Sequence, residues 1–257
     1  METFQAYYTD IHAPGWQQHA AAQLRDRGLV TFSDITGRDG LIDIARQVMS
    51  IRPHRDADPD GVTVITQTQD DSSGYAGFTD AELIPHTDGS AVPSPPGLPL
   101  LACQRAADEG GSTRVVDGAR AIRTLAVQHP ASLGPLSAPQ AAFFGAGGAY
   151  RGAPLEPAGP GRIRVRLRLD DLAWFSTQAA GAIPLLRAAI AGHTQTFRLR
   201  AGEGLLLSNT RWLHGRDNFV GHRSMLRILG DPLPSTGILP GFPSPVPVTD
   251  LQEPLAA

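Results

Sequence analysis

The sequence is poor in cysteine, in charged residues and in long apolar runs. Its single cysteine, Cys103, can form neither a disulfide framework nor a cysteine-rich zinc site. Charged residues make up 18% and the formal net charge is −3, without a basic cluster, so we expect no nucleic-acid partner. No apolar run approaches the ~18 residues of a membrane span, and the N-terminus lacks the basic start and apolar core of a signal peptide. We therefore expect a reduced, soluble, cytoplasmic protein without a membrane partner, and we leave open whether it forms a homo-oligomer.

Turn-forming residues, by contrast, are abundant. The 257 residues include 28 glycines and 22 prolines, which favours many short elements over a helical bundle. Helical patterns occur early in the chain, and short strand patterns dominate from about residue 60 onward. Evenly spaced strands separated by Gly/Pro turns are typical of a sandwich or a barrel. We predict an α+β, mainly β fold, namely a double-stranded β-helix (jelly-roll) barrel with flanking helices.

We expect one domain over 1–257, because no linker or internal repeat divides the chain. Its predicted parts are a helical/strand flank (1–58), a jelly-roll core (59–231) with a lid insertion near 131–161, and a Pro-rich tail (232–257). The Gly/Ala/Pro-rich stretch 131–161 carries no regular period, so we expect irregular structure there. Expected helices cover 14–28, 41–48, 118–129 (capped by Asp117) and 178–192; expected strands cover 29–34, 61–69, 98–106, 112–118, 162–169, 194–200, 204–209 and 223–230.

One short stretch, Ile84-Pro85-His86-Thr87-Asp88-Gly89-Ser90, indicates a metal site. In an extended chain, residues i and i+2 point the same way, so His86 and Asp88 aim at one point. Downstream, His214 follows an apolar strand. Two histidines and one carboxylate would form a facial triad, which suits non-haem Fe(II) and leaves coordination positions open. For the remaining histidines we expect structural roles: His12, His19, His54, His129, His193 and His222.

Four motifs in order carry a resemblance: PHTD, EGGSTRVVDG, LLLSNTRWLHGRDNF and RSMLR. Together they resemble the TauD/TfdA-type branch of the Fe(II)/2-oxoglutarate-dependent oxygenases, a grouping that includes clavaminate synthase-like enzymes. The motifs span about residues 61–230. The resemblance implies an enzyme that binds Fe(II), 2-oxoglutarate and O2, releases succinate and CO2, and hydroxylates or desaturates an unactivated C–H bond. Related halogenases carry a small residue where Asp88 stands, so chlorination is not expected.

The resemblance also implies residues that hold 2-oxoglutarate. Arg227, thirteen positions after His214, is predicted to bind the distal carboxylate, with Arg223 as the runner-up or as a residue near the metal-proximal carboxylate. Thr113 matches a family threonine whose hydroxyl assists the distal carboxylate. Asn209 is interpreted as structural, bonding local backbone.

The substrate side of the site is less defined. In RIRVRLRL the side chains of Arg162, Arg164, Arg166 and Arg168 alternate with apolar ones, and they could either line a substrate cleft or cover a solvated strand face. Gln67 and Gln69 share a strand face that either contacts a polar substrate or faces solvent. Residues 70–80 suggest a lid, and Trp212 and Phe219 are assigned to core packing.

These features favour a small polar substrate that bears a carboxylate, such as an amino acid or a natural-product intermediate. Two other classes stay open. One is a catalytically inactive jelly-roll protein that binds a small molecule without metal chemistry. The other is a zinc hydrolase, although no HExxH-like element is present.

Overall fold

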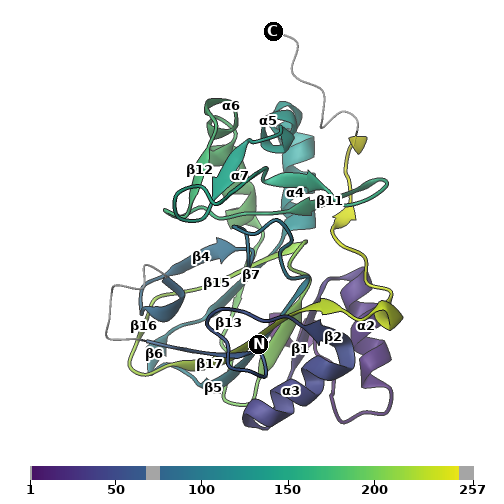
Figure 1. Cartoon of the computed structure of the whole chain (residues 1–257), viewed down its shortest axis with the longest axis vertical. Helices are drawn as coiled ribbons and strands as arrows, with labels where there is room; N and C mark the ends of the chain where they lie inside the picture. Colours follow the sequence, from purple (N-terminus) through teal and green to yellow (C-terminus); the bar gives the residue numbers. More distant parts are fainter. Residues whose placement is uncertain (1, 68–75, 249–257) are drawn as a thin grey trace.

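The computed structural model describes residues 2–67 and 76–248 and shows a mixed α/β, strand-rich fold (Figure 1). Its larger sheet has the order β1 (Leu29–Phe32), β14 (Gly204–Leu207), β5 (Leu98–Arg105), β17 (Ser224–Pro232) and β2 (Met49–Ile51), and β3 (Val62–Thr66) also pairs with β17. A second sheet has the order β13 (Thr194–Phe197), β7 (Thr113–Asp117), β15 (Trp212–Arg216) and β4 (Leu83–His86). Neighbouring strands in both sheets are antiparallel.

The two sheets pack on each other through alternate residues of their strands. In β14, Leu205 and Leu207 join a buried cluster that includes Val115 and Trp212 of the second sheet. The residue between them, Leu206, belongs instead to a cluster on the opposite face of the larger sheet. Since successive strand side chains point to opposite faces, this apolar strand is covered on both sides.

The cover on the outer face comes from the early helices. The N-terminal helices are α1 (Glu2–Ala6), α2 (Trp16–Asp26) and α3 (Gly37–Val48), and α2 and α3 contribute to the cluster on the outer face of the larger sheet. In α3 the buried residues Leu41, Ile44, Ala45 and Val48 follow the helical spacing seen in the sequence. Within the described residues, no helix combines the length and the apolar character needed to cross a bilayer.

A further group of elements, which we call the cap, lies above the two sheets in Figure 1. It holds α4 (Gly118–Gln128), α5 (Leu133–Ser137), α6 (Thr177–Ala180), α7 (Ile183–Gly192) and the three-stranded sheets β12 (Ala173–Phe175)–β8 (Ala142–Phe144)–β9 (Tyr150–Gly152) and β10 (Leu155–Pro157)–β11 (Arg162–Val165)–β18 (Phe242–Pro243). The apolar core of the cap also includes Val116 and Leu213 of the second sheet. The remaining elements of the described residues are short: β6 (Glu109–Gly110), β16 (Phe219–Val220), and 3-10 turns at Ala76–Phe78, Pro130–Ser132 and Pro234–Thr236.

Most expected elements are confirmed within a few residues, including α4, whose N-terminal N–H of Ala119 is capped by the side chain of Asp117. Three expectations are wrong. Residues 131–161 are not irregular, because β8 and β9 pair with each other and β8 and β10 pair with strands that follow the segment. The strand expected over 162–169 ends at Val165. The helix expected over 178–192 is two helices, and Pro184 lies in the first turn of the second.

The C-terminal strand anchors the tail to the cap, which yields a stability prediction. Phe242 is 2% exposed within the core of the cap. Replacing it by alanine (Phe242→Ala) should lower the free energy of unfolding by about 3–5 kcal/mol through lost burial and a residual cavity. Leu239, in the same tail, is 61% exposed, so Leu239→Ala should change stability by no more than about 0.5 kcal/mol. Urea denaturation measures both variants, and equal losses would contradict the packing described here.

Candidate metal centre

Two neighbouring strands bring the candidate ligands together. His86 is the last residue of β4, and His214 is the central residue of β15. The two strands pair with His86 opposite His214, which places both imidazoles on one face of the sheet. Asp88 follows β4 by two residues, and all three side chains are buried.

A glycine allows this strand pair to approach closely. The register between β4 and β15 shifts just after His214, at a bulge. At Gly215 a Cβ atom would lie 2.3 Å from the carbonyl oxygen of Leu83. A larger residue at 215 would therefore push β4 away and separate the two imidazoles.

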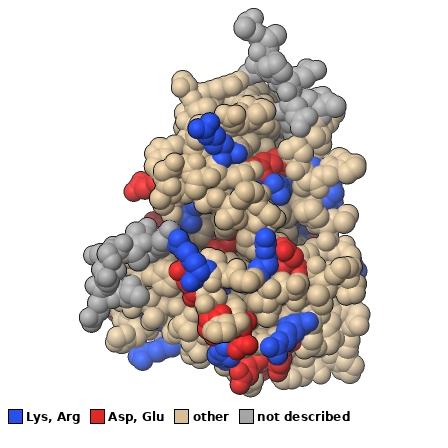
Figure 2. All heavy atoms as spheres, viewed as in Figure 1, with Lys and Arg blue, Asp and Glu red and all other residues tan. Residues whose placement is uncertain are grey.

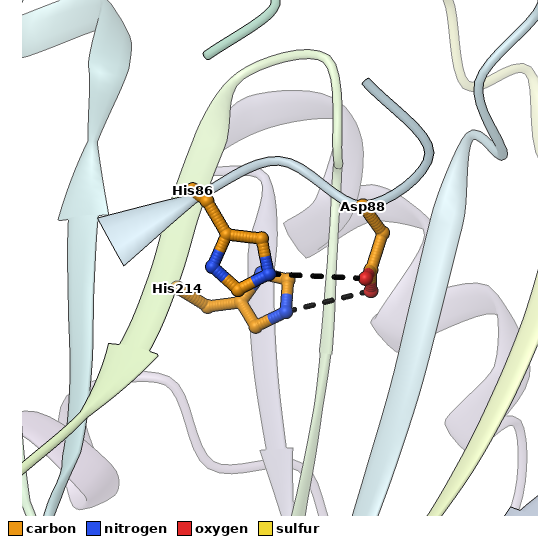
Figure 3. A group of neighbouring side chains, drawn as sticks. All are labelled: His86, Asp88 and His214. Atoms are coloured by element: carbon orange, nitrogen blue, oxygen red, sulfur yellow. Dashed lines mark ion pairs between the residues drawn. The ribbon is translucent and has the colours of Figure 1, made fainter. Parts of the chain in front are cut away.

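The three side chains point toward one another (Figure 3). The Nε2 atom of His214 lies 3.4 Å from Oδ2 of Asp88, and Nε2 of His86 lies 4.0 Å from Oδ1. One nitrogen or oxygen atom from each residue lies within 4.8 Å of the other two. This spacing allows three protein ligands on one side of a single ion.

The surrounding hydrogen bonds leave the facing atoms available to an ion. The Nδ1 atom of His86 lies 3.0 Å from the carbonyl oxygen of Ile84, which can only accept. Nδ1 is therefore protonated and donates to it, and Nε2 keeps its lone pair. Oδ2 of Asp88 is buried and accepts no hydrogen bond from the described residues. A buried carboxylate oxygen without a donor is costly unless a cation compensates it, so the donor set fits a divalent metal.

Electrostatics hold these groups in the ionisation states of metal ligands. Burial, followed by the charges of His214 and Arg168, lowers the pKa of His86 to about 3, so its imidazole is neutral. Burial acts to raise the pKa of Asp88, but Arg227 and then His214 outweigh it and hold the pKa below its usual range. Neutral imidazole and ionised carboxylate are the forms that bind Fe(II).

Asn209 fixes the backbone of Asp88. Its Oδ1 accepts from the Asp88 N–H, and its Nδ2 donates to the carbonyl oxygens of Asp88 and Pro96, each at 2.8 Å. The predicted structural role is confirmed, but the bonded backbone is 121 residues away rather than local. Asn209 precedes His214 by five residues, so the turn that leads into β15 and His214 also holds the backbone of Asp88.

The cluster lies on the wall of a cavity of about 630 Å³. Five arginines (Arg55, Arg168, Arg216, Arg223 and Arg227) and two aspartates (Asp56 and Asp88) line it, together with many apolar side chains. Its size suits one or two small molecules. On the face shown in Figure 2, basic and acidic side chains are interspersed without a continuous basic patch.

The two arginines predicted for 2-oxoglutarate lie at different places on this wall. Arg227 donates from Nη1 to Oδ1 of Asp88 at 3.0 Å, so its guanidinium lies beside the proposed metal position. Arg223 lies with Thr113 on the wall of the main cavity and of a small adjoining hollow. Burial lowers the pKa of Arg223, and burial followed by the charge of Arg223 lowers the pKa of Arg216 to about 10. Arg223 and Arg216 thus place two positive charges at the same end of the cavity.

Of the four alternating arginines, the structure places only Arg168 on the cavity wall. Arg162 donates to the carbonyl oxygens of Pro240 and Gly241. Arg164 and Arg166 both pair with Glu156. Arg162, Arg164 and Arg166 therefore do not line this cavity, contrary to the predicted substrate cleft, because the tail and Glu156 take up their guanidinium groups. The opposite reading, a fully solvated face, is wrong for Arg166, which is buried.

The remaining site predictions had mixed outcomes. Gln67 is exposed and is not among the described residues that line the cavity, and Gln69 lies outside the described residues. Part of the predicted 70–80 lid is also outside them, but Gly77 and Phe78 do line the cavity. Trp212 and Phe219 are buried in the protein, as predicted.

His54 is a cavity residue that sequence reasoning assigned to structure. It lines the cavity beside Arg55 and Asp56, and its Nδ1 accepts the backbone N–H of Asp56 at 3.3 Å. Burial, followed by the charge of Arg227, lowers its pKa. A histidine in a loop without a motif gave no signal of this position in the sequence.

The fold and this buried His–Asp–His cluster are features expected of a non-haem iron oxygenase. Comparison with protein-family models matches residues 6–229 to the family described as "Taurine catabolism dioxygenase TauD, TfdA family". The chain belongs to this family, which confirms the resemblance seen in the four motifs and with it an enzyme that depends on non-haem iron and 2-oxoglutarate. Comparison with curated protein sequences gave no match.

Solved structures with the same fold include three oxygenases. An asparagine oxygenase in complex with Fe(II), 2S,3S-3-hydroxyasparagine and succinate is 16% identical, with a TM-score of 0.70 and coverage of 85% of this chain and 80% of that one. The oxygenase OrfP in complex with Fe, succinate and (3S)-hydroxy-L-Arg is 15% identical, with a TM-score of 0.68 and coverage of 85% and 81%. PvcB from Pseudomonas aeruginosa is 15% identical, with a TM-score of 0.65 and coverage of 86% and 84%. At these identities the likeness establishes the fold.

Removing the Asn209 side chain tests whether its hydrogen bonds to Asp88 stabilise the protein. Asn209 is 1% exposed, and Asn209→Ala would leave the buried N–H and carbonyl of Asp88 without partners. The free energy of unfolding should fall by about 1–3 kcal/mol. The exposed Asn218 offers the control, and Asn218→Ala should have little effect. Chemical denaturation followed by circular dichroism measures both variants. An unchanged free energy of unfolding in Asn209→Ala would show that the turn at Asp88 does not depend on Asn209.

Proposed function

We propose that His86, Asp88 and His214 hold Fe(II), and that the enzyme hydroxylates or desaturates an unactivated C–H bond of a small polar substrate. The observation that carries this proposal is the convergence of three ligand-type groups within 4.8 Å on a cavity wall. When bound, iron and 2-oxoglutarate supply the oxidising chemistry, in which O2 is consumed and succinate and CO2 are released. The side chains of the protein hold these groups, set their orientation and present the substrate.

For 2-oxoglutarate, the geometry favours an exchange of the two predicted arginine roles. Arg227 contacts Asp88, so it lies at the metal end, and its buried Nε has no hydrogen-bond partner among the described residues. It therefore suits the metal-proximal carboxylate. Arg223 and Thr113 lie farther along the wall, where a guanidinium and a hydroxyl can bind the distal carboxylate of the same molecule.

For the substrate, we infer a small polar molecule that bears a carboxylate, such as an amino acid or a natural-product intermediate. Arginines outnumber aspartates on the cavity wall, and the charges of Fe(II) and 2-oxoglutarate cancel each other. The asparagine oxygenase and OrfP, which share the fold, contain hydroxylated amino acids in their structures. His54 supports this inference, because a neutral imidazole whose Nδ1 accepts a backbone N–H presents an Nε2–H donor.

For the architecture, we propose that the two facing antiparallel sheets form a distorted double-stranded β-helix and that 1–257 is a single catalytic domain. Val116 and Leu213 of the second sheet belong to the apolar core of the cap, which supports a single folding unit. The lid role is proposed for Ala76–Phe78 and for residues 145–149, since both segments contribute to the cavity wall.

Metal and co-substrate binding can be tested without knowing the substrate. Adding Fe(II) and 2-oxoglutarate under argon should give the wild-type protein a weak visible charge-transfer band. Asp88→Ala should lose the band while staying folded, because one of three ligands is gone, whereas Asp171→Ala, at an exposed position, should keep it. A flat wild-type spectrum would favour the catalytically inactive binding protein, and chelator-sensitive turnover without 2-oxoglutarate would favour the hydrolase.

The arginine roles make a second prediction. Arg223→Met should raise the dissociation constant of 2-oxoglutarate at least about 30-fold, because a buried charge pair loses one partner. Arg200→Met, at an exposed position, should leave it near the wild-type value. Titration of the charge-transfer band in each variant measures these constants. If Arg227→Met weakened 2-oxoglutarate strongly and Arg223→Met did not, Arg227 would be the distal ligand after all.

A further inference from the structure

The side chain of Arg166 is charged yet almost completely buried. It follows β11 directly and is 1% exposed. Nε donates to Oε1 of Glu156 at 3.0 Å, and the guanidinium lies over the ring of Tyr150, 4.0 Å from its centroid. Glu156 and Tyr150 both belong to the cap, so one end of this cluster is fixed there.

The other end of the guanidinium holds the turn that follows Asp88. Nη1 of Arg166 donates to the carbonyl oxygens of Ser90 and Val92 at 2.8 and 2.6 Å, and Nη2 donates to that of Pro93 at 3.1 Å. These carbonyls belong to a turn that lies outside the sheets, so they have no place in a regular strand ladder. A planar fork of several N–H groups can serve them together, which a point charge cannot do.

Neighbouring hydrogen bonds hold the segment that carries Asp88 itself. The backbone N–H of Leu167 donates to Oγ1 of Thr87 at 3.0 Å, and the N–H of Thr87 donates to the carbonyl oxygen of Leu167 at 2.9 Å. Residues 166–167 therefore run along 87–93 on the side of the cap. Asn209 holds the backbone of Asp88 from the side of β15. The segment that carries Asp88 is thus clamped between two parts of the protein.

The same turn also contacts a segment that faces the cavity. A Cβ atom at Gly145 would lie 2.7 Å from Cβ of Ala91, so the two backbones are in close contact there. Gly145, Ala146 and Ala149 line the cavity, and Tyr150, next in sequence, stacks on Arg166. The cluster therefore joins the cavity wall of the cap to the turn after Asp88.

We propose that Arg166 is a positioning residue for the metal centre: by holding the carbonyls of residues 90, 92 and 93 it fixes the turn that aims Asp88 at His86 and His214. Arg166 touches neither the metal position nor the cavity, and it acts through the backbone of the Asp88 segment. The inference rests on the proposed role of Asp88 as a metal ligand. Without Arg166, Glu156 keeps its pair with Arg164, but the carboxylate of Asp88 loses its fixed orientation.

Arg164 provides a matched control. It pairs with the same Glu156, through Nε and Nη2 at 2.8 and 2.7 Å, and no described contact joins it to residues 90–93. Metal-free wild type, Arg166→Met and Arg164→Met are titrated with Mn(II) by calorimetry, well below each unfolding temperature. We expect Arg166→Met to bind Mn(II) about 10- to 100-fold more weakly, as for losses of groups that orient metal ligands, and Arg164→Met to bind as wild type does. The Fe(II)–2-oxoglutarate band should shift or weaken only in Arg166→Met.

The outcomes separate this inference from the proposed function. If wild type binds Mn(II) and Arg166→Met binds it equally well, Arg166 is structural only and the inference fails. Equal weakening in Arg164→Met would assign the effect to general loss of stability and also overturn it. If wild type binds no metal, the proposed function itself fails. Should Arg166→Met not fold, Arg166→Lys replaces it: lysine keeps the charge beside Glu156 but not the fork, so it should fold and bind Mn(II) several-fold more weakly, and wild-type affinity would refute the inference.

Discussion

The pairing of β4 with β15 is the constraint on which the site depends. Antiparallel pairing with His214 opposite His86 places two imidazoles side by side, with ring centroids 4.8 Å apart. The bulge at Gly215 and the turn held by Asn209 then bring Asp88 to the same point. Burial of two imidazoles and a carboxylate without an ion would be unfavourable in most proteins. Arg227 compensates part of the charge of Asp88 through its bond to Oδ1, whereas Oδ2 has no donor among the described residues and stays available to a metal ion.

The sequence allowed prediction of the parts of this site that rest on local pattern. His86 and Asp88 stand two residues apart in an extended segment, which is a purely local signal. His214 lies 128 residues beyond His86 and could be joined to them only through the order of the four motifs. The family match over residues 6–229 confirms that order. His54 lies in a loop without any motif, so only the folded structure shows that it faces the cavity.

Alternation in a strand reveals that two faces differ, but not what packs on each. The arginines of RIRVRLRL share a face, and the sequence could not show that Glu156, in the paired strand β10, would cover it. The strands within 131–161 were missed for the same reason. Three-residue strands such as β8 and β9 are too short for a period, and their stability comes from the partners they meet only after folding. Tertiary contact, rather than local preference, decided these regions.

The basic residues show how a chain rich in glycine and proline satisfies its backbone. All 22 basic side chains are arginines, since the sequence contains no lysine. Many of them donate to carbonyl oxygens of turns: Arg166 to the turn after Asp88, Arg162 to the tail, and Arg216 to the carbonyls of residues 79 and 81. With 28 glycines and 22 prolines, much of the backbone lies outside regular ladders, and proline offers no N–H. A guanidinium can reach two or three such carbonyls at once, so the same residue type that pairs with Asp88 in the cavity also stabilises the loops that form its wall.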